Sequence, residues 1–141
     1  MFRRIPARLG YAFRGVLAAV RLDQSFAEHT VCAGLVIAAG IVLRVNLLEG
    51  CLLALCITAV VAAEMFNTAI EQLAKAVHPE QSPLVGASLD IAAGSVLITS
   101  LGAALVGSVI FGYRLGIMLG WWVQPPMFAP MPSLGMIWGS W

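Results

Sequence analysis

The sequence predicts an all-α membrane protein with three transmembrane helices and an N-terminal amphipathic helix on the membrane surface. Composition is the first observation: 60% of the 141 residues are hydrophobic and 11% are charged, whereas soluble domains carry about 25% charged residues. The second is the placement of the charges, which leaves three long apolar runs. A chain of this length forms one domain. Five arginines precede the first apolar run without any recognisable nucleic-acid-binding module, so we expect no nucleic-acid partner.

The N-terminal segment, residues 1–29, is predicted to be the surface helix. Its apolar side chains recur every three or four residues between arginines, which is typical of a helix lying in a membrane interface. The apolar positions are Ile5, Leu9, Phe13, Val16 and Val20, and the arginines are Arg3, Arg4, Arg8, Arg14 and Arg21. A cleaved signal peptide is the alternative, but Arg8 and Arg14 interrupt its apolar core. Because all five arginines precede the first crossing, we expect a cytoplasmic N-terminus.

The first transmembrane helix is expected to begin between Ala27 and Thr30 and to end near Leu48. It contains a long stretch without charge, as a membrane crossing requires. We expect a short turn at Glu49-Gly50, because glycine is a common breaker between helices. The transmembrane domain as a whole is predicted to cover residues 30–114.

The second transmembrane helix is expected from about Cys51 to Val77, which is long enough to cross a bilayer and project further. A loop with two prolines follows at 78–83. The third helix is expected to begin near Leu84 and to cross between Ile91 and Tyr113, with an interfacial end there.

The C-terminal segment, residues 115–141, is rich in tryptophan and proline and lacks charge. Proline interrupts it too often for a fourth crossing. We expect this tail to lie at the outer interface or to pack on a partner protein.

A polar row on the second helix is the main candidate site. Glu64, Asn67 and Glu71 are spaced i, i+3 and i+7, so they project from one face of the helix. A carboxylate at membrane depth costs about 2.5–3.5 kcal/mol unless it meets water, a metal or a partner. The alternative is that these groups only hold helices together. Three aligned polar groups favour a site.

The predicted topology brings further acidic groups to the same side of the membrane. Glu71, Asp90 and residues 26–29 all fall near the cytoplasmic interface. Such a cluster would hold Mg²⁺ and meet a nucleotide from the aqueous side and a lipid from the membrane side. The three cysteines lack CxxC spacing and are expected to pack as small hydrophobic residues.

Four segments resemble one known family, the small prokaryotic lipid kinases that phosphorylate diacylglycerol or undecaprenol. The most specific of them is the polar row with the residues between its members. Together the segments span residues 11–97, and they are Tyr11-Ala-Phe-Arg-Gly15, Ser25-Phe-Ala-Glu-His29, Glu64-Met-Phe-Asn-Thr-Ala-Ile-Glu71 and Asp90-Ile-Ala-Ala-Gly-Ser-Val-Leu97.

The resemblance implies a homotrimer in a bacterial inner membrane, with active sites shared between protomers. It implies transfer of the ATP γ-phosphoryl group to a lipid hydroxyl, with Mg²⁺ as cofactor. The implied catalytic residues are Glu64, as general base, with Asn67 and Asp90. Glu71 would hold Mg²⁺, with Glu28 and His29 as further metal ligands. Tyr11 and Arg14 would lie near the nucleotide.

The sequence also departs from the family pattern, always by losing a basic group. Leu89 stands where the family has a lysine, and Ala27 where it has an arginine. Ser82, Gly86 and Ala87 replace the loop's usual histidine and basic residues. Phosphoryl transfer relies on cations that neutralise phosphate charge, each often worth orders of magnitude in rate.

Three hypotheses therefore stay open from the sequence. An active lipid kinase is favoured by the intact acidic residues, with Arg14, Arg21 or Lys75 replacing the lost cations in space. A non-catalytic subunit that docks in a larger membrane complex is favoured by the missing basic residues and by the uncharged, Trp/Pro-rich C-terminal tail. A channel or transporter is the weakest hypothesis, because the chain has no inverted repeat.

Overall fold

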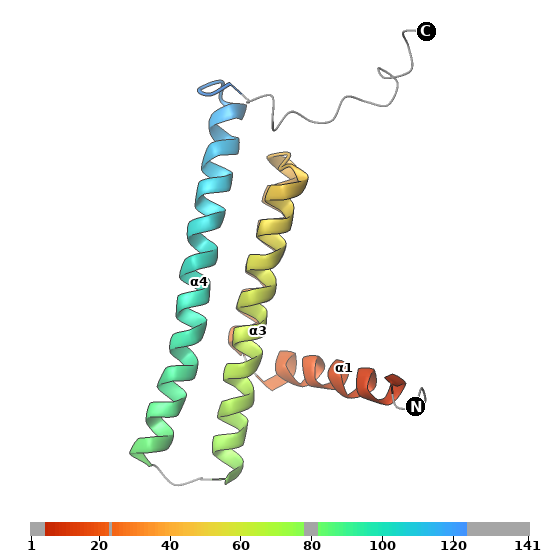
Figure 1. Ribbon diagram of the computed structural model, residues 1–141, viewed down its shortest axis with the longest axis vertical. Coiled ribbons are helices and arrows are strands. Elements are labelled where there is room, and N and C mark those ends of the chain that lie inside the picture. Colours follow the sequence, from red (N-terminus) through yellow and green to blue (C-terminus); the bar gives the residue numbers. More distant parts are fainter. Residues whose placement is uncertain (1–4, 23, 78–81, 124–141) are drawn as a thin grey trace.

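The computed structural model describes residues 5–22, 24–77 and 82–123, and those parts of the chain are almost wholly helical (Figure 1). The helices are α1 (Ile5–Leu22), α2 (Gln24–Val42), α3 (Leu47–Val77) and α4 (Pro83–Met118). The last three are each long and apolar enough to cross a membrane. The predicted fold class is confirmed, and the trimer stays a prediction.

The lengths of the three long helices differ in a way that locates the membrane. α2 has 19 residues, α3 has 31 and α4 has 36, which correspond to about 28, 46 and 54 Å at 1.5 Å per residue. A bilayer's hydrocarbon core is about 30 Å thick. α2 therefore matches the core, whereas α3 and α4 extend beyond it, mainly on the side where α1 lies (Figure 1).

Helix α1 leaves the side of the bundle and runs transverse to α3 and α4 (Figure 1). It contacts α2 and α3, and Ala19 of α1 and Phe26 of α2 are buried. Tyr11, Phe13 and Leu17 are exposed apolar or aromatic side chains on the same helix. This orientation and composition fit a helix that lies along the membrane surface.

The bundle is held mainly by α3 and α4, which pack along each other, while α2 packs chiefly on α3. The buried apolar side chains are few and include Leu53, Val60, Ala92 and Ile110. Many large apolar side chains of the three long helices are exposed instead. In a membrane these side chains contact lipid chains, so their exposure carries no penalty from water.

The predicted turn at Glu49-Gly50 is wrong, because both residues belong to the first turn of α3. The turn covers residues 43–46. The backbone N–H of Asn46 donates to Glu49 Oε2 at 2.9 Å, and the N–H of Glu49 donates to Asn46 Oδ1 at 2.9 Å. This reciprocal pair is a capping box, which satisfies two N–H groups at the helix start and fixes α3 to begin at Leu47.

The predicted boundary between the surface helix and the first crossing is also displaced. α1 ends at Leu22 and α2 already begins at Gln24, so residues 24–29 belong to the transmembrane helix. Glu28 and His29 therefore lie on α2, in its first two turns. Residue 23, between the two helices, lies outside the described residues.

Helix α4 continues through Met118, four residues past residue 114, where the transmembrane domain was predicted to end. Arg114 is buried within the protein, and its Nε donates to Glu49 Oε2 at 2.7 Å. Most of the predicted tail, from residue 124 onward, lies outside the described residues, as do residues 78–81 of the predicted loop.

The chain folds back on itself after α4. Gly120 has φ +74, a left-handed conformation that favours glycine, and the N–H of Trp121 donates to the carbonyl of Gly116 at 2.9 Å. The Trp122 ring stacks on Tyr113 with 5.6 Å between centroids. A β-carbon on Gly116 would lie 2.6 Å from Trp122 Cε3, so the ring occupies the space above that glycine.

The Gly116→Ala substitution is expected to lower the free energy of unfolding by about 1–3 kcal/mol, because the added methyl group displaces the Trp122 ring. Gly112→Ala is the matched control, since a β-carbon there meets nothing within 4 Å and alanine favours helix by about 1 kcal/mol. Thermal unfolding in detergent should show opposite signs for the two variants. Equal shifts would contradict this packing.

Candidate active site

The polar row predicted on the second crossing lies on α3, and part of it faces the inside of the bundle. Glu64 is only 2% exposed and Asn67 only 8%. Thr68 is buried beside them, and its hydroxyl donates to the carbonyl of Glu64 at 3.0 Å. Buried carboxylate and amide groups are rare in such an apolar chain, so this part of α3 is the polar centre of the bundle.

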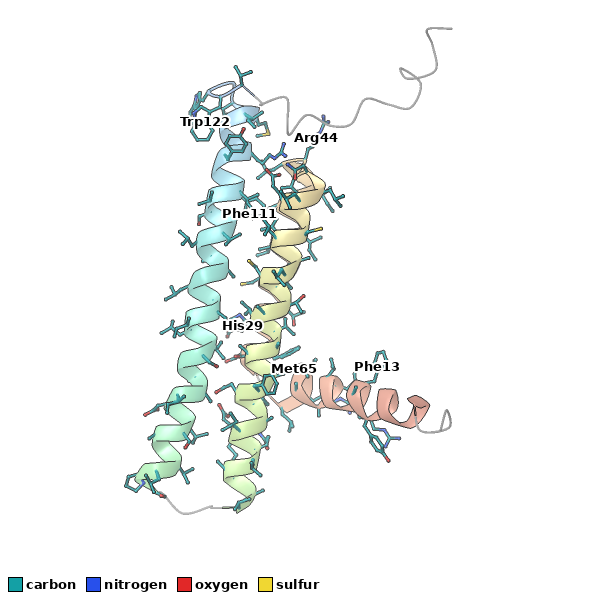
Figure 2. All side chains as sticks on the ribbon, in the orientation of Figure 1. Phe13, His29, Arg44, Met65, Phe111 and Trp122 are labelled. Atoms are coloured by element: carbon teal, nitrogen blue, oxygen red, sulfur yellow. The ribbon has the colours of Figure 1, made fainter. Side chains whose placement is uncertain are left out.

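His29 on α2 approaches Glu64 across the helix interface. His29 Nε2 lies 3.8 Å from Glu64 Oε1, and the histidine side chain is 28% exposed. The contact is longer than a hydrogen bond and short enough for an ion pair when the imidazole is protonated. The fold thus brings together two of the predicted site residues from different helices, and Figure 2 shows His29 between α3 and α4.

The contact between His29 and Glu64 is close to the membrane surface. Met65, the residue after Glu64, lies where α1 meets the bundle (Figure 2). Leu47 to Glu64 is 17 residues of α3, which rise about 26 Å and so nearly cross the hydrocarbon core. Glu64 therefore lies at the edge of the core on the α1 side.

The rest of the row forms a ladder toward the end of α3. Asn67 Nδ2 donates to Glu71 Oε1 at 3.2 Å, and Lys75 Nζ lies 3.5 Å from Glu71 Oε2. Both side chains of the Glu71–Lys75 pair are substantially exposed, so this ion pair adds little stability. Asn67 Oδ1 is buried and has no hydrogen-bond partner among the described residues.

Four other predicted site residues lie elsewhere on the chain. Tyr11 is 69% exposed, and Arg14, Glu28 and Asp90 are exposed as well. In the described part of the chain, none of the four forms a hydrogen bond or ion pair with the polar row. Their roles at the site stay predictions.

The predicted metal ligands are not gathered within one chain. Across residues 5–22, 24–77 and 82–123, no three His, Cys, Asp or Glu side chains lie close enough together to hold an ion. His29 contacts Glu64, whereas Glu71 contacts Asn67 and Lys75. The set of Glu28, His29 and Glu71 therefore also stays a prediction.

An apolar cavity of about 600 Å³ lies between α2, α3 and α4, and sequence reasoning missed it. It begins beside His29 and reaches Phe111, which lies nearer the far end of the bundle (Figure 2). The small side chains of Ala103, Ala104 and Gly107 line it on α4. These small residues were the available signal, because they leave space where larger side chains would fill the interface.

A second polar group, which we call the far-end cluster, was also missed. It consists of Asn46, Glu49 and Arg114 and lies at the opposite end of the bundle from Glu64. Arg114 is 6% exposed and the Glu49 side chain 13%. The two partners are 65 residues apart in sequence, so no local pattern predicts their pairing. The Asn-x-x-Glu spacing of the capping box was the only available signal.

Comparison with known proteins identifies the family to which this sequence is similar. The sequence matches the prokaryotic diacylglycerol kinase family over residues 10–111. A diacylglycerol kinase of Synechocystis sp. is 32% identical over 101 residues, which cover 71% of this chain and 58% of that relative. No solved structure matches the chain. The family match includes α2, α3 and the whole polar row, and the chain therefore belongs to the prokaryotic diacylglycerol kinase family.

Proposed function

We propose that the protein is a membrane lipid kinase that transfers the γ-phosphoryl group of ATP to a lipid hydroxyl. The observation that carries the proposal is Glu64, a buried carboxylate facing His29 at the level where the surface helix meets the bundle. At this level a lipid hydroxyl in the membrane and a nucleotide in water can reach the same group. Family membership supports phosphoryl transfer as the reaction.

Glu64 would act as the general base. Its carboxylate accepts the proton as the lipid O–H bond breaks, and the lipid oxygen bonds to the γ-phosphorus. The bridging P–O bond of ATP breaks at the same time, and ADP leaves with the bond's electron pair. His29, 3.8 Å from Oε1, orients the carboxylate. Positioned general bases typically contribute about 10²–10⁴-fold in rate.

The ladder of Asn67, Glu71 and Lys75 fits the nucleotide side of the site. Asn67 Oδ1 is a buried acceptor without a partner in the described residues, and the same side chain donates from Nδ2 to Glu71 Oε1 at 3.2 Å. Hard oxygen ligands such as these suit Mg²⁺. When bound, Mg²⁺ would neutralise charge on the transferring phosphates. Lys75 would supply a cation in place of the lysine that the family has at Leu89.

The apolar cavity supports a long-chain lipid as substrate. Its volume of about 600 Å³ is within the roughly 300–1,000 Å³ range of small-molecule sites. His29 lines its edge and also contacts Glu64, so a chain in the cavity would place its hydroxyl near the base. Diacylglycerol and undecaprenol both carry a hydroxyl group on a long apolar part.

We further propose a homotrimer with shared sites, in a bacterial inner membrane with the N-terminus cytoplasmic. Arg14 and Arg21 lie on α1 before the first crossing, which favours that orientation. Tyr11, Arg14 and Asp90 are exposed, and within the described residues they form no hydrogen bond or ion pair with the polar row of their own chain. A neighbouring copy would supply them to the site.

The decisive experiment measures ATP- and Mg²⁺-dependent phosphorylation by the purified protein in mixed micelles. Diacylglycerol and undecaprenol are tested separately, and a reaction without Mg²⁺ is the blank. We expect phosphorylated lipid from at least one substrate. If a folded preparation phosphorylates neither lipid, the kinase proposal is wrong for these substrates.

The Lys75→Gln variant is expected to raise the KM for ATP about tenfold, because it removes a cation that faces the phosphates. A tenfold change corresponds to about 1.4 kcal/mol of binding free energy. Initial rates at varied ATP concentration measure the effect. Arg44→Gln is the matched control, because it removes an exposed cation at the opposite end of the bundle. An unchanged KM in Lys75→Gln would show that this lysine is not at the nucleotide.

A non-catalytic subunit of a larger membrane complex is the second candidate. Leu89 is half-buried beside the exposed Asp90, and Ala27 is exposed on α2. Neither position offers the cation that the family pattern has there. Under this alternative the polar row holds helices together, and the lipid assay gives no product from folded protein.

A further inference from the structure

We propose that the far-end cluster binds the headgroup of an anionic phospholipid. Asn46 and Arg114 are both bonded to one oxygen, Glu49 Oε2, at 2.9 and 2.7 Å. Each also has a donor left over: Asn46 Nδ2 and Arg114 Nη2 are buried and have no hydrogen-bond partner in the described residues. Two unused donors therefore lie in the same small cluster.

The chemistry of the missing partner follows from these donors. Both are N–H groups, and one belongs to the guanidinium of Arg114, a residue that is only 6% exposed. A buried donor without an acceptor is costly, and more so when it is charged. Acceptor oxygens would satisfy these donors, and a phosphate matches guanidinium geometry especially well.

The charge at this end of the bundle points to an anion. Arg44, Glu49 and Arg114 are the charged residues in 40–55 and 108–123, so the net charge there is 2 − 1 = +1. A phosphodiester headgroup such as that of phosphatidylglycerol carries one negative charge. Its binding would make this end of the bundle neutral.

Arg44 provides an exposed cation for the headgroup. It lies in the turn before α3, at the same end as Trp122 (Figure 2), and its φ is +52. This left-handed conformation costs a residue with a β-carbon roughly 1–2 kcal/mol, and glycine would avoid that cost. Two backbone hydrogen bonds close this turn, from the Arg44 N–H to the Ile41 carbonyl at 3.2 Å and from the Val45 N–H to the Gly40 carbonyl at 3.1 Å, so the left-handed residue ends α2 as a helix C-cap and presents its side chain at this end of the bundle.

The surroundings favour a membrane lipid over free phosphate. The cluster lies at the ends of membrane-spanning helices, beside exposed Trp121, Trp122 and Leu47. Tryptophan is typical of the headgroup level of membranes, and the exposed apolar side chains would contact the lipid's chains. Because Nη2 and Nδ2 are covered by other atoms, binding requires side-chain rearrangement at this end.

The test measures thermal unfolding of the full-length protein in neutral detergent while short-chain phosphatidylglycerol is added. Phosphatidylcholine with the same chains and inorganic phosphate are the comparison ligands. Two variants remove the proposed contacts: Arg44→Gln, and Asn46→Ser, since serine is an equally good N-cap without the amide donor. Lys75→Gln is the charge-matched control on the other side of the molecule.

We expect saturable stabilisation by phosphatidylglycerol but not by phosphatidylcholine. Arg44→Gln and Asn46→Ser should each weaken the apparent affinity at least about tenfold, and Lys75→Gln should respond as the wild type does. Equal stabilisation by both lipids, or unchanged affinity in Arg44→Gln and Asn46→Ser, overturns the proposal. Equal stabilisation by inorganic phosphate would assign the site to a free anion and overturn the lipid.

Discussion

Glu64→Gln is expected to lower the rate of lipid phosphorylation by about 10²–10⁴-fold, the usual contribution of a general base. Glutamine keeps the size and hydrogen-bonding capacity of the side chain but cannot accept the hydroxyl proton. Glu64 is 2% exposed and faces His29, so no bulk water replaces the lost base efficiently. The KM for ATP should change little, because Glu64 is proposed to act on the lipid hydroxyl, while Asn67, Glu71 and Lys75 are the groups proposed to bind the nucleotide.

Initial rates at saturating ATP and lipid measure this effect, with thermal unfolding as a check that the variant is folded. Ser88→Ala is a suitable control, because the exposed Ser88 hydroxyl bonds only the backbone of its own helix. Glu64→Asp should keep part of the activity, since it retains a carboxylate. A Glu64→Gln rate within threefold of the wild type would exclude Glu64 as the base.

Glu49→Gln is expected to lower the free energy of unfolding by about 3–5 kcal/mol, the usual cost of removing one partner from a buried ion pair. Arg114 would stay buried with its charge uncompensated. Glutamine serves in a capping box as glutamate does, so the start of α3 is retained. The loss is therefore assigned to the charge and not to the cap.

Unfolding in detergent measures this loss, and a double-mutant cycle tests its origin. Glu49→Gln combined with Arg114→Met should be more stable than Glu49→Gln alone, because the second substitution removes the unpaired buried charge. A single-variant loss below about 1 kcal/mol would mean that Arg114 reaches water or another acceptor. Additive effects of the two substitutions would lead to the same conclusion.

The fold and the polar row were both accessible from sequence because they depend on local periodicity. Three long apolar runs define three crossings whatever their packing. The i, i+3, i+7 spacing places Glu64, Asn67 and Glu71 on one helix face. The structure agrees in that Glu64 and Asn67 are buried and Asn67 donates to Glu71.

The remaining features depend on how helices are rotated and aligned against each other, which local patterns do not determine. The Glu49–Arg114 pair joins α3 to α4 across 65 residues of sequence. The cavity arises where three helices meet. The helix boundary at Asn46 is different, because its Asn-x-x-Glu spacing was visible and the adjacent Gly50 was given too much weight as a breaker.

The short length of α2 has a consequence for the bilayer itself. This helix of 19 residues connects a turn at one interface to a transverse helix held at the other, so it cannot lengthen, and tilting only shortens its reach. A thicker bilayer must thin around the protein, at a cost of fractions of a kcal/mol per Å of mismatch. The His29–Glu64 contact joins α2 to α3 at the edge of the hydrocarbon core. A mismatch between the length of α2 and the thickness of the bilayer therefore affects this contact.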